Sequence, residues 1–413
     1  MESARLVGAL TRVTGDMSLA EELAQDALVA ALETWPSTGL PARPGAWLMA
    51  TAKHRAIDSF RRAQRLAGRT AEIGRSMTQV EEPDWAAALD EVVEDDVLRL
   101  VFISCHPVLS REARVALTLR LVGGLTTAEI ARAFLAAEST IAQRIVRAKR
   151  TLTAARVPFE VPAGAEFTAR LSSVLEVLYL VFNEGYAATA GADWTRPDLC
   201  AEALRLGRVL AELTPAEPEV HGLVALMEVQ ASRLGARTAP DGAPVLLLDQ
   251  DRSRWDRVLI GRGLAALQRA EQSGRALGPY ALQASIAACH ARARTAEETD
   301  WTRIAALYEA LAGETPSPVV ELNRAVAVAM AYGPAAGLEL VDRLTAVPAL
   351  RNYHLLPSVR GDLLAKLGRP AEARAEFERA AALTRNDRER ALLTGRAAAC
   401  AAGPGDAAAA RPG

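Results

Sequence analysis

Apolar residues recur at helical spacing along almost the whole chain, and no alternating run of polar and apolar residues indicates a β-strand. The first two amphipathic patterns cover residues 3–13 and 19–35. The second pattern turns small and medium apolar side chains inward: Leu23, Ala27, Ala30 and Ala31. Proline lacks the amide hydrogen that a helix interior needs, so we expect Pro36 to end this helix. The pattern predicts an all-α protein.

A loop rich in proline and glycine, residues 36–45, separates the second helix from a third one. Pro44 suits the first turn of this helix, where its fixed φ is already helical. The expected inward face of the third helix carries these residues at helical spacing: Trp47, Ala50, His54, Ile57 and Phe60. A histidine on an inward face is usually a core residue, so we expect His54 to be buried. Trp35 and Trp47 should also pack in the core.

Residues 126–150, TTAEIARAFLAAESTIAQRIVRAKR, predict two helices joined by a tight turn. Thr126 and Glu129 have the spacing of a capping box, in which each side chain binds the backbone amide of the other residue. The second helix should start near Ser139, with Glu138 or Ser139 as its cap. Its inward face carries apolar side chains: Ile141, Ile145 and Ala148. Residues 92–105 and 111–121 should form the helices that complete this module.

The outward face of that last helix carries hydroxyl, amide and cationic groups: Ser139, Thr140, Gln143, Arg144, Arg147 and Lys149. A short helix, a turn and a second helix with such groups can read base edges from the major groove of DNA. The alternative is a basic surface on an ordinary helical hairpin.

Composition and charge limit the class of protein. At 413 residues the chain exceeds one typical domain. The formal net charge of −2 argues against a uniformly basic nucleic-acid binder, but residues 53–69 and 144–156 are basic whereas residues 81–96 are acidic. The four cysteines lack metal-ligand spacing, which indicates a reducing compartment. Since no signal peptide or membrane span is evident, we expect a cytoplasmic protein without membrane contact, metal or cofactor.

The order of these segments is more informative than any one of them. An acidic amphipathic helix, a Pro/Gly loop, an A-W-L helix ending in D-x-x-R-R, an acidic linker and a helix-turn-helix resembles the extracytoplasmic-function sigma factors of bacterial RNA polymerase. The resemblance implies that residues 1–68 are sigma region two, which binds core polymerase and the −10 element. Residues 92–157 would be sigma region four, which binds the −35 element, and residues 69–91 would be a flexible linker.

The resemblance also implies roles for individual residues. Carboxylates of the second helix would dock on the polymerase clamp: Glu21, Glu22 and Asp26. Residues of the following loop and helix would contact the −10 element and phosphates: Ser37, Thr38, Arg43, Lys53, Arg55, Arg61, Arg62 and Arg65. The helix-turn-helix would read the −35 element beside the polymerase flap. For the carboxylates, a solvated helix face is the alternative. The chain departs from the family at Leu135 and Ala137, where the usual turn carries Gly and a Ser cap.

Helical sequence continues through residues 158–400, beyond the length of a plain family member. Residues 354–385 match a tetratricopeptide pattern of small and large packing residues: Gly361, Leu364, Gly368, Ala373, Phe377 and Ala380. Three further stretches are weaker helical pairs: residues 322–344, 301–320 and 198–234. The whole chain thus resembles the group of extracytoplasmic-function sigma factors with a tetratricopeptide-like extension. The resemblance implies that the extension regulates activity through a protein partner or an intramolecular contact, and residues 401–413 should be disordered.

Two polar segments resemble recurring segments of that group, FNEGY at residues 182–186 and LLLDQDRSRWD at residues 246–256. They contain four residues that could line a pocket or else form helix ends and interdomain hydrogen bonds: Asn183, Glu184, Asp251 and Arg252. One rival class is an enzyme with paired carboxylates, but no catalytic triad, metal cluster or phosphate-binding loop is evident, so we expect no catalytic residue. A second rival is a helix-turn-helix regulator with a sensor domain that acts without joining polymerase.

Overall fold

The computed structural model describes residues 2–71, 96–134, 136–187, 195–240 and 242–401, and for residues 2, 58–71, 132 and 133 it describes the backbone alone. The regular structure of this part is helical apart from one isolated bridge between Thr238 and Pro244, which confirms the predicted all-α class. The chain divides into two compact units, Met1–Val177 and Leu178–Gly413.

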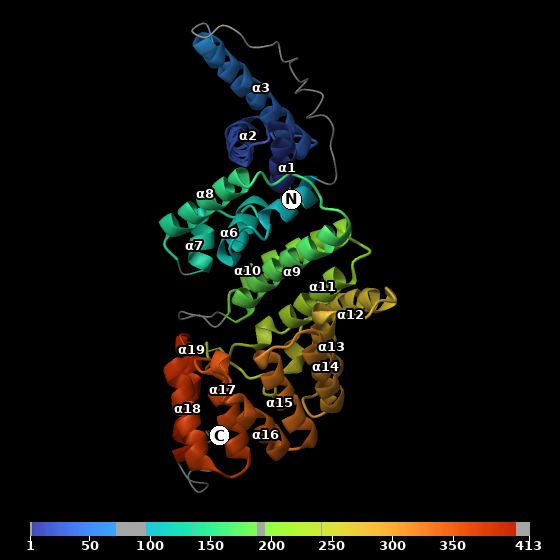
Figure 1. Cartoon of the computed structure of the whole chain (residues 1–413), viewed down its shortest axis with the longest axis vertical. Helices are drawn as coiled ribbons and strands as arrows, with labels where there is room; N and C mark the ends of the chain where they lie inside the picture. Colours follow the sequence, from blue (N-terminus) through green and yellow to red (C-terminus); the bar gives the residue numbers. More distant parts are fainter. Residues whose placement is uncertain (1, 72–95, 135, 188–194, 241, 402–413) are drawn as a thin grey trace. The chain divides into compact units, whose positions relative to one another are not determined.

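The first unit contains these helices: α1 (Glu2–Thr14), α2 (Met17–Thr38), α3 (Pro44–Ala71), α5 (Asp96–Ser104), α6 (Arg111–Leu121), α7 (Thr127–Ala133), α8 (Glu138–Ala154) and the first part of α9 (Gly164–Tyr186) (Figure 1). Asp16 caps α2 by accepting hydrogen bonds from the backbone amides of Ser18 and Leu19 at 2.7 and 3.2 Å. The linker predicted for residues 69–91 starts too early, because α3 continues to Ala71, and from residue 72 onward it lies outside the described residues.

The prediction that Pro36 ends the second helix is wrong, because α2 continues to Thr38. The hydroxyl groups of Ser37 and Thr38 donate hydrogen bonds to the carbonyl oxygen of Thr34 at 2.9 and 3.0 Å. These local bonds stabilise the turn that contains the proline. Gly39, at a φ of 82°, then ends the helix.

The predicted inward face of α3 is also wrong. The buried residues are Leu48, Ala52 and Ala56, whereas Ala50 and His54 are exposed. Small side chains face the neighbouring helices because they permit the backbones to approach closely. Of the other residues predicted for this face, Trp47 and Ile57 are half-buried, and the side chain of Phe60 lies outside the described part.

The two tryptophans predicted in the core are half-buried instead. Trp35 at the end of α2 and Trp47 at the start of α3 pack edge to face, with ring centres 5.4 Å apart. The contact therefore joins the ends of α2 and α3 around the intervening loop.

Charged and polar bonds connect α5 to its neighbours in the first unit. Asp96, at the start of α5, is buried and accepts from Arg12 of α1 at 3.1 Å and from Arg99 at 2.8 Å. At the other end of α5, Arg170 of α9 donates to the carbonyl oxygen of Phe102 at 3.0 Å. Carbonyl groups at a helix end lack partners within the helix, so this side chain satisfies one of them.

The second unit contains the end of α9 and ten further α-helices: α10 (Pro197–Leu213), α11 (Pro218–Ala231), α12 (Arg257–Gln272), α13 (Pro279–Arg292), α14 (Trp301–Glu314), α15 (Pro318–Tyr332), α16 (Pro334–Leu344), α17 (Leu355–Lys366), α18 (Pro370–Leu383) and α19 (Asp387–Ala401). Among its described residues it also contains three short 3₁₀ turns: η1 (Leu234–Ala236), η2 (Arg252–Arg254) and η3 (Pro348–Leu350). Several of these helices begin with proline, whose fixed φ suits the first turn. Residues 402–413, predicted to be disordered, lie outside the described part.

The helical pairs predicted in residues 354–385 and 322–344 are confirmed as α17 with α18 and α15 with α16. Gly361 of α17 allows close packing, since a Cβ atom there would lie 2.9 Å from the ring of Phe377 and 3.2 Å from the carbonyl oxygen of Ala373. The same role falls to Gly337 in the earlier pair. Assignment of these pairs to tetratricopeptide repeats stays a prediction.

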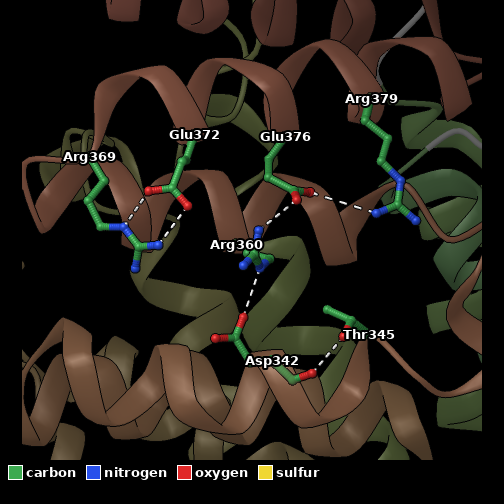
Figure 2. A network of polar contacts seen from close by, with 7 residues as sticks. All are labelled: Asp342, Thr345, Arg360, Arg369, Glu372, Glu376 and Arg379. Atoms are coloured by element: carbon green, nitrogen blue, oxygen red, sulfur yellow. Dashed lines mark hydrogen bonds and ion pairs between the residues drawn. The ribbon is translucent and has the colours of Figure 1, made fainter.

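An arginine connects three successive helices of this unit, as Figure 2 shows. Arg360 of α17 donates to Asp342 of α16 and to Glu376 of α18, each at 2.8 Å. Glu376 also lies 3.9 Å from Arg379. Although burial lowers the pKa of Arg360, the two carboxylates raise it overall, so this arginine stays charged between the helices.

A glycine also allows α11 and α13 to approach each other closely. A Cβ atom on Gly222 would lie 2.6 Å from the backbone nitrogen of Ala281 and 2.8 Å from its Cα atom. One turn earlier, Glu219 accepts hydrogen bonds from the amides of Tyr280 and Ala281 at 2.9 and 3.1 Å. A glycine and a carboxylate thus fix the start of α13 against α11.

Candidate nucleic-acid interface

The helix-turn-helix begins with the predicted capping box. The backbone amide of Thr126 donates to Oε2 of Glu129 at 2.7 Å, and the amide of Glu129 donates to Oγ1 of Thr126 at 3.2 Å. These reciprocal bonds satisfy two amides at the start of α7. Gly124, at a φ of 75°, supplies the turn before the box.

Replacing Thr126 with alanine should lower the stability of α7 by about 1 kcal/mol, because the hydroxyl acceptor for the Glu129 amide is lost. Amide hydrogen exchange in α7 measures this change. Thr151→Ala, on the surface of α8, is the matched control and should leave exchange in α7 unaltered. Equal protection of α7 in the Thr126 variant and the native chain would show that the box contributes nothing.

The second helix, α8, starts at Glu138, and its N-cap is Ala137. The prediction that Glu138 or Ser139 caps this helix is wrong, since Ala137 occupies the extended cap position and its methyl side chain cannot accept a hydrogen bond. Helix starts bind anions through their backbone amides. A phosphate oxygen is therefore a suitable acceptor at this end.

The inward face of α8 is confirmed, because Ile141, Ile145 and Ala148 are buried. On the outward face, five of the predicted −35 residues lie near one another. Four are exposed and the last is half-buried: Ser139, Thr140, Gln143, Arg147 and Arg144. These side chains present donors and acceptors to solvent from one continuous helix surface.

The outward face of α8 lines a groove of about 450 Å³ together with the start of α6. Thr140, Gln143, Arg144 and Arg147 form one wall. The other wall includes residues around the first turn of α6: Ser110, Glu112 and Ala113. The groove combines guanidinium groups with a helix N-terminus, two features that bind phosphate.

One carboxylate lies in this groove. The pKa of Glu112 is lowered, first by its own backbone amide, next by the side chain of Ser110, and further by Arg144 and Arg111. Glu112 is therefore ionised at neutral pH and attracts the Arg144 side chain. It limits the positive potential at one end of the groove.

Lys149 does not belong to this exposed surface. Its ammonium group binds the Glu21 carboxylate of α2, which also accepts a hydrogen bond from Arg120 of α6 at 2.5 Å. All three side chains are largely buried. Glu21 is thus not an outward carboxylate, contrary to the helical pattern. Local sequence patterns do not reveal this contact, because Glu21 is 99 residues from Arg120 and 128 residues from Lys149.

The predicted polymerase-docking face of α2 retains two exposed carboxylates, Glu22 and Asp26, and Asp26 lies 3.2 Å from Arg55 of α3. The sequence pattern missed apolar residues beside them. Val29 is 50% exposed and Leu32 is 76% exposed. Glu22, Asp26 and Val29 follow helical spacing, so exposed apolar area adjoins the two carboxylates on α2.

The predicted −10 and phosphate-contacting residues divide into two sets. The side chains of the first set are described on α2, α3 and the loop between them, with three exposed (Ser37, Thr38 and Arg43) and two half-buried (Lys53 and Arg55). The side chains of the second set lie outside the described part of α3: Arg61, Arg62 and Arg65. Roles in DNA binding stay predictions for both sets.

The two acids considered for paired catalysis have separate structural roles. Glu184 forms an ion pair with Arg196 at 2.5 Å, and Asp251 caps η2 by accepting from the amide of Ser253 at 2.9 Å. Across the described residues, no group of His, Cys, Asp and Glu has the arrangement of a metal site. In the same part of the chain, no helix has the length and apolar character of a membrane span.

Family profiles match three parts of the chain. One described as Sigma-70 region 2 matches residues 2–66, and one described as Sigma-70, region 4 matches residues 99–152. A third, a family of unknown function (DUF6596), matches residues 170–271. Both of the first two matches lie in the first unit: one covers α1, α2 and most of α3, and the other covers α6, α7 and most of α5 and α8.

Curated relatives match either nearly all of the chain or its first third. An uncharacterized protein of Rhizobium meliloti (strain 1021) is 46% identical over 388 residues, 94% of this chain and 91% of that protein. ECF RNA polymerase sigma factor SigK of Mycobacterium sp. (strain KMS) is 30% identical over 145 residues, 34% of this chain and 72% of that protein. ECF RNA polymerase sigma factor SigL of Mycobacterium tuberculosis (strain ATCC 25618 / H37Rv) is 33% identical over 144 residues, 34% and 76% of the two chains. No solved structure matches the chain significantly.

Proposed function

Since the chain belongs to the extracytoplasmic-function family of RNA polymerase sigma factors, we propose that it joins core RNA polymerase and directs the enzyme to promoters with −35 and −10 elements. The helices of residues 1–68 would bind the polymerase and the −10 element. The helix-turn-helix of residues 92–157 would bind the −35 element beside the flap. Both activities require promoter DNA and core polymerase, so the protein would act in the cytoplasm.

The groove beside α8 is the observation that carries this proposal. Gln143 presents an amide and Arg147 a guanidinium on an exposed helix, and these groups suit adenine and guanine edges in the major groove. The start of α8, whose N-cap Ala137 offers no side-chain acceptor, suits a backbone phosphate. A phosphate contact beside the base-reading side chains would fix the register of α8 on the DNA.

The exposed face of α2 supports the polymerase contact. Val29 and Leu32 offer apolar area, while Glu22 and Asp26 offer negative charge that can meet a basic partner. Apolar area supplies affinity, and the flanking charges select the orientation of docking. The clamp of core polymerase is the proposed partner of this face.

Co-purification with core polymerase and transcription in vitro test the proposal. The full-length chain should bind core polymerase and produce transcripts that start at one promoter position. Binding to operator DNA without polymerase, and no effect on initiation, would instead favour a helix-turn-helix regulator. Residues 158–400 have a proposed regulatory role. Transcription by a truncated chain that ends at residue 157 shows whether these residues inhibit or assist initiation.

Changing Glu22 and Asp26 to lysine should weaken binding to core polymerase by roughly tenfold or more, because reversed charges repel a basic docking surface. Affinity measured by titration of labelled protein with core polymerase checks this result. The control is Glu271→Lys with Glu309→Lys, which makes the same change in net charge at exposed positions of the second unit. Unaltered affinity in the first variant would mean that the two acids form a solvated face.

A further inference from the structure

The two polar segments of unexplained role approach one cavity in the second unit. The cavity has a volume of about 190 Å³. From the FNEGY segment, Phe182, Asn183 and Tyr186 line it, and from the LLLDQDRSRWD segment Leu247 does so. Of the four residues singled out in these segments, only Asn183 lines the cavity, whereas Glu184, Asp251 and Arg252 serve structural contacts around it.

A buried arginine faces this cavity. Arg233, just after α11, is 4% exposed, and no ion pair joins it to a carboxylate of the described chain. Its Nε atom is buried without a hydrogen-bond partner. Its guanidinium carbon lies 5.9 Å from the ring centre of Tyr186 and 5.6 Å from that of Trp255. Ring contacts stabilise a cation partly, but they do not replace hydrogen bonds to an anion.

The neighbouring Arg252 also has a buried Nε without a partner, but its two terminal nitrogens have acceptors in this unit. It donates to the carbonyl oxygens of His290 and Ala293, each at 2.9 Å, and to the hydroxyl of Thr299 at 3.0 Å. Arg252 thus has a structural role, fixing η2 to the end of α13. Arg233 has no comparable set of acceptors.

The other polar residues around the cavity do not neutralise Arg233. Burial, followed by the charges of Arg233 and Arg252, lowers the pKa of His290 to about 3, so this histidine is neutral at pH 7. Burial raises the pKa of Tyr308 to about 12, so this phenol is neutral as well. No carboxylate is among the described residues that line the cavity. The cavity therefore holds one uncompensated positive charge, and a buried charge of this kind favours an anionic partner.

The remaining walls are aromatic. Four aromatic side chains surround the space: Tyr179, Phe182, Tyr186 and Tyr308. Tyr179 is held in place because its hydroxyl donates to Gln283 at 3.0 Å. Gln230, also in the wall, has a buried side-chain oxygen without a partner, which suits a ligand with its own donor. Since a cavity of about 150 Å³ accommodates benzene, this one has room for one ring with a small polar group.

We propose that this cavity binds a small aromatic carboxylate, with the carboxylate on Arg233 and the ring between the tyrosine side chains and Phe182. Carboxylate matches the planar donor set of a guanidinium group, and the rings favour a flat apolar body. This inference goes beyond the proposed function, because binding to the second unit does not require that the chain joins polymerase.

Titration calorimetry of the full-length protein with benzoate tests the proposal. Benzoate should bind saturably at one site, and benzamide, its neutral isostere, should bind roughly tenfold to a hundredfold more weakly, as expected for loss of a charge-assisted hydrogen bond. Acetate should also bind more weakly than benzoate because it lacks the ring. Equal affinity for benzoate and benzamide, or no benzoate binding at millimolar concentration, would overturn the proposal. Equal affinity for acetate and benzoate would overturn the inference that the ligand is aromatic.

Two variants locate the site. Arg233→Gln should lose benzoate binding, while Arg262→Gln, which removes the same charge from an exposed position on α12, should keep it. Ala287→Leu fills the cavity from α13 and retains Arg233, so it should lose benzoate binding without a change in charge. Circular dichroism shows whether each variant is folded. If Arg233→Gln fails to fold, the Ala287→Leu result decides, and undiminished benzoate binding there would place the ligand elsewhere.

Discussion

Replacing Arg144 and Arg147 with alanine should lower transcription from a −35-dependent promoter by about a hundredfold, while affinity for core polymerase stays the same. Both side chains line the groove beside α8, and neither contributes to the buried face of the helix. A good contact between a side chain and a base contributes about 1–3 kcal/mol, and loss of two contacts of about 1.4 kcal/mol each gives this effect.

The matched control is Arg262→Ala with Arg269→Ala, which removes two positive charges from exposed positions of α12. This control should transcribe normally, because general attraction to DNA is nearly unchanged there. Transcription in vitro and filter binding to core polymerase measure the two activities separately. Loss of polymerase binding with DNA recognition preserved would contradict the assignment of α8 as the DNA-reading helix.

Gly222→Ala should destabilise the second unit by about 3 kcal/mol. The added methyl group would lie within 3 Å of the backbone of Ala281, and backbone atoms cannot move aside as a flexible side chain can. Either α11 and α13 separate or both helices distort. Urea unfolding followed by far-ultraviolet circular dichroism measures the loss as a lower midpoint for the transition of this unit.

Gly261→Ala on α12 provides a control of opposite sign. No atom lies within 4 Å of the position that its Cβ would occupy, so only helix propensity changes. Alanine is favoured over glycine in a helix by about 1 kcal/mol, which should raise the midpoint. If both substitutions shifted the midpoint in the same direction, the close contact of Gly222 would not be the cause.

Local patterns predicted the helix-turn-helix correctly because its determinants are close in sequence. Thr126 and Glu129 are three residues apart and form the expected reciprocal bonds. The apolar face of α8 follows directly from the helical period of Ile141 and Ile145. Capping and periodicity act within one or two turns, so a single sequence contains all the information they need.

Predictions failed where the partner helix decides the outcome. Helical spacing from Trp47 predicts an inward face of α3 with mostly large side chains, but the residues that are buried against the neighbouring helices include Ala52 and Ala56. Helical periodicity also does not predict the ion pair between Glu21 and Arg120, because Arg120 lies in a helix that is distant in sequence. Likewise, nothing in the local sequence distinguishes Arg233 from other arginines. Arg233 becomes a candidate binding residue only because it is buried and because the described cavity wall contains no acidic partner.

The Glu21 contact has a thermodynamic consequence for promoter binding. Lys149 was predicted to bind DNA, yet its ammonium group is occupied by the carboxylate of Glu21. An ammonium group has three donors, but Lys149 is largely buried against Glu21, so a DNA phosphate would reach it only if this contact opened. Linkage makes this competition reciprocal: the packing of α2 against α8 weakens phosphate binding by the same factor as phosphate binding weakens the packing. Occupancy of the −35 element would therefore loosen α2, the helix that carries the exposed docking face for polymerase.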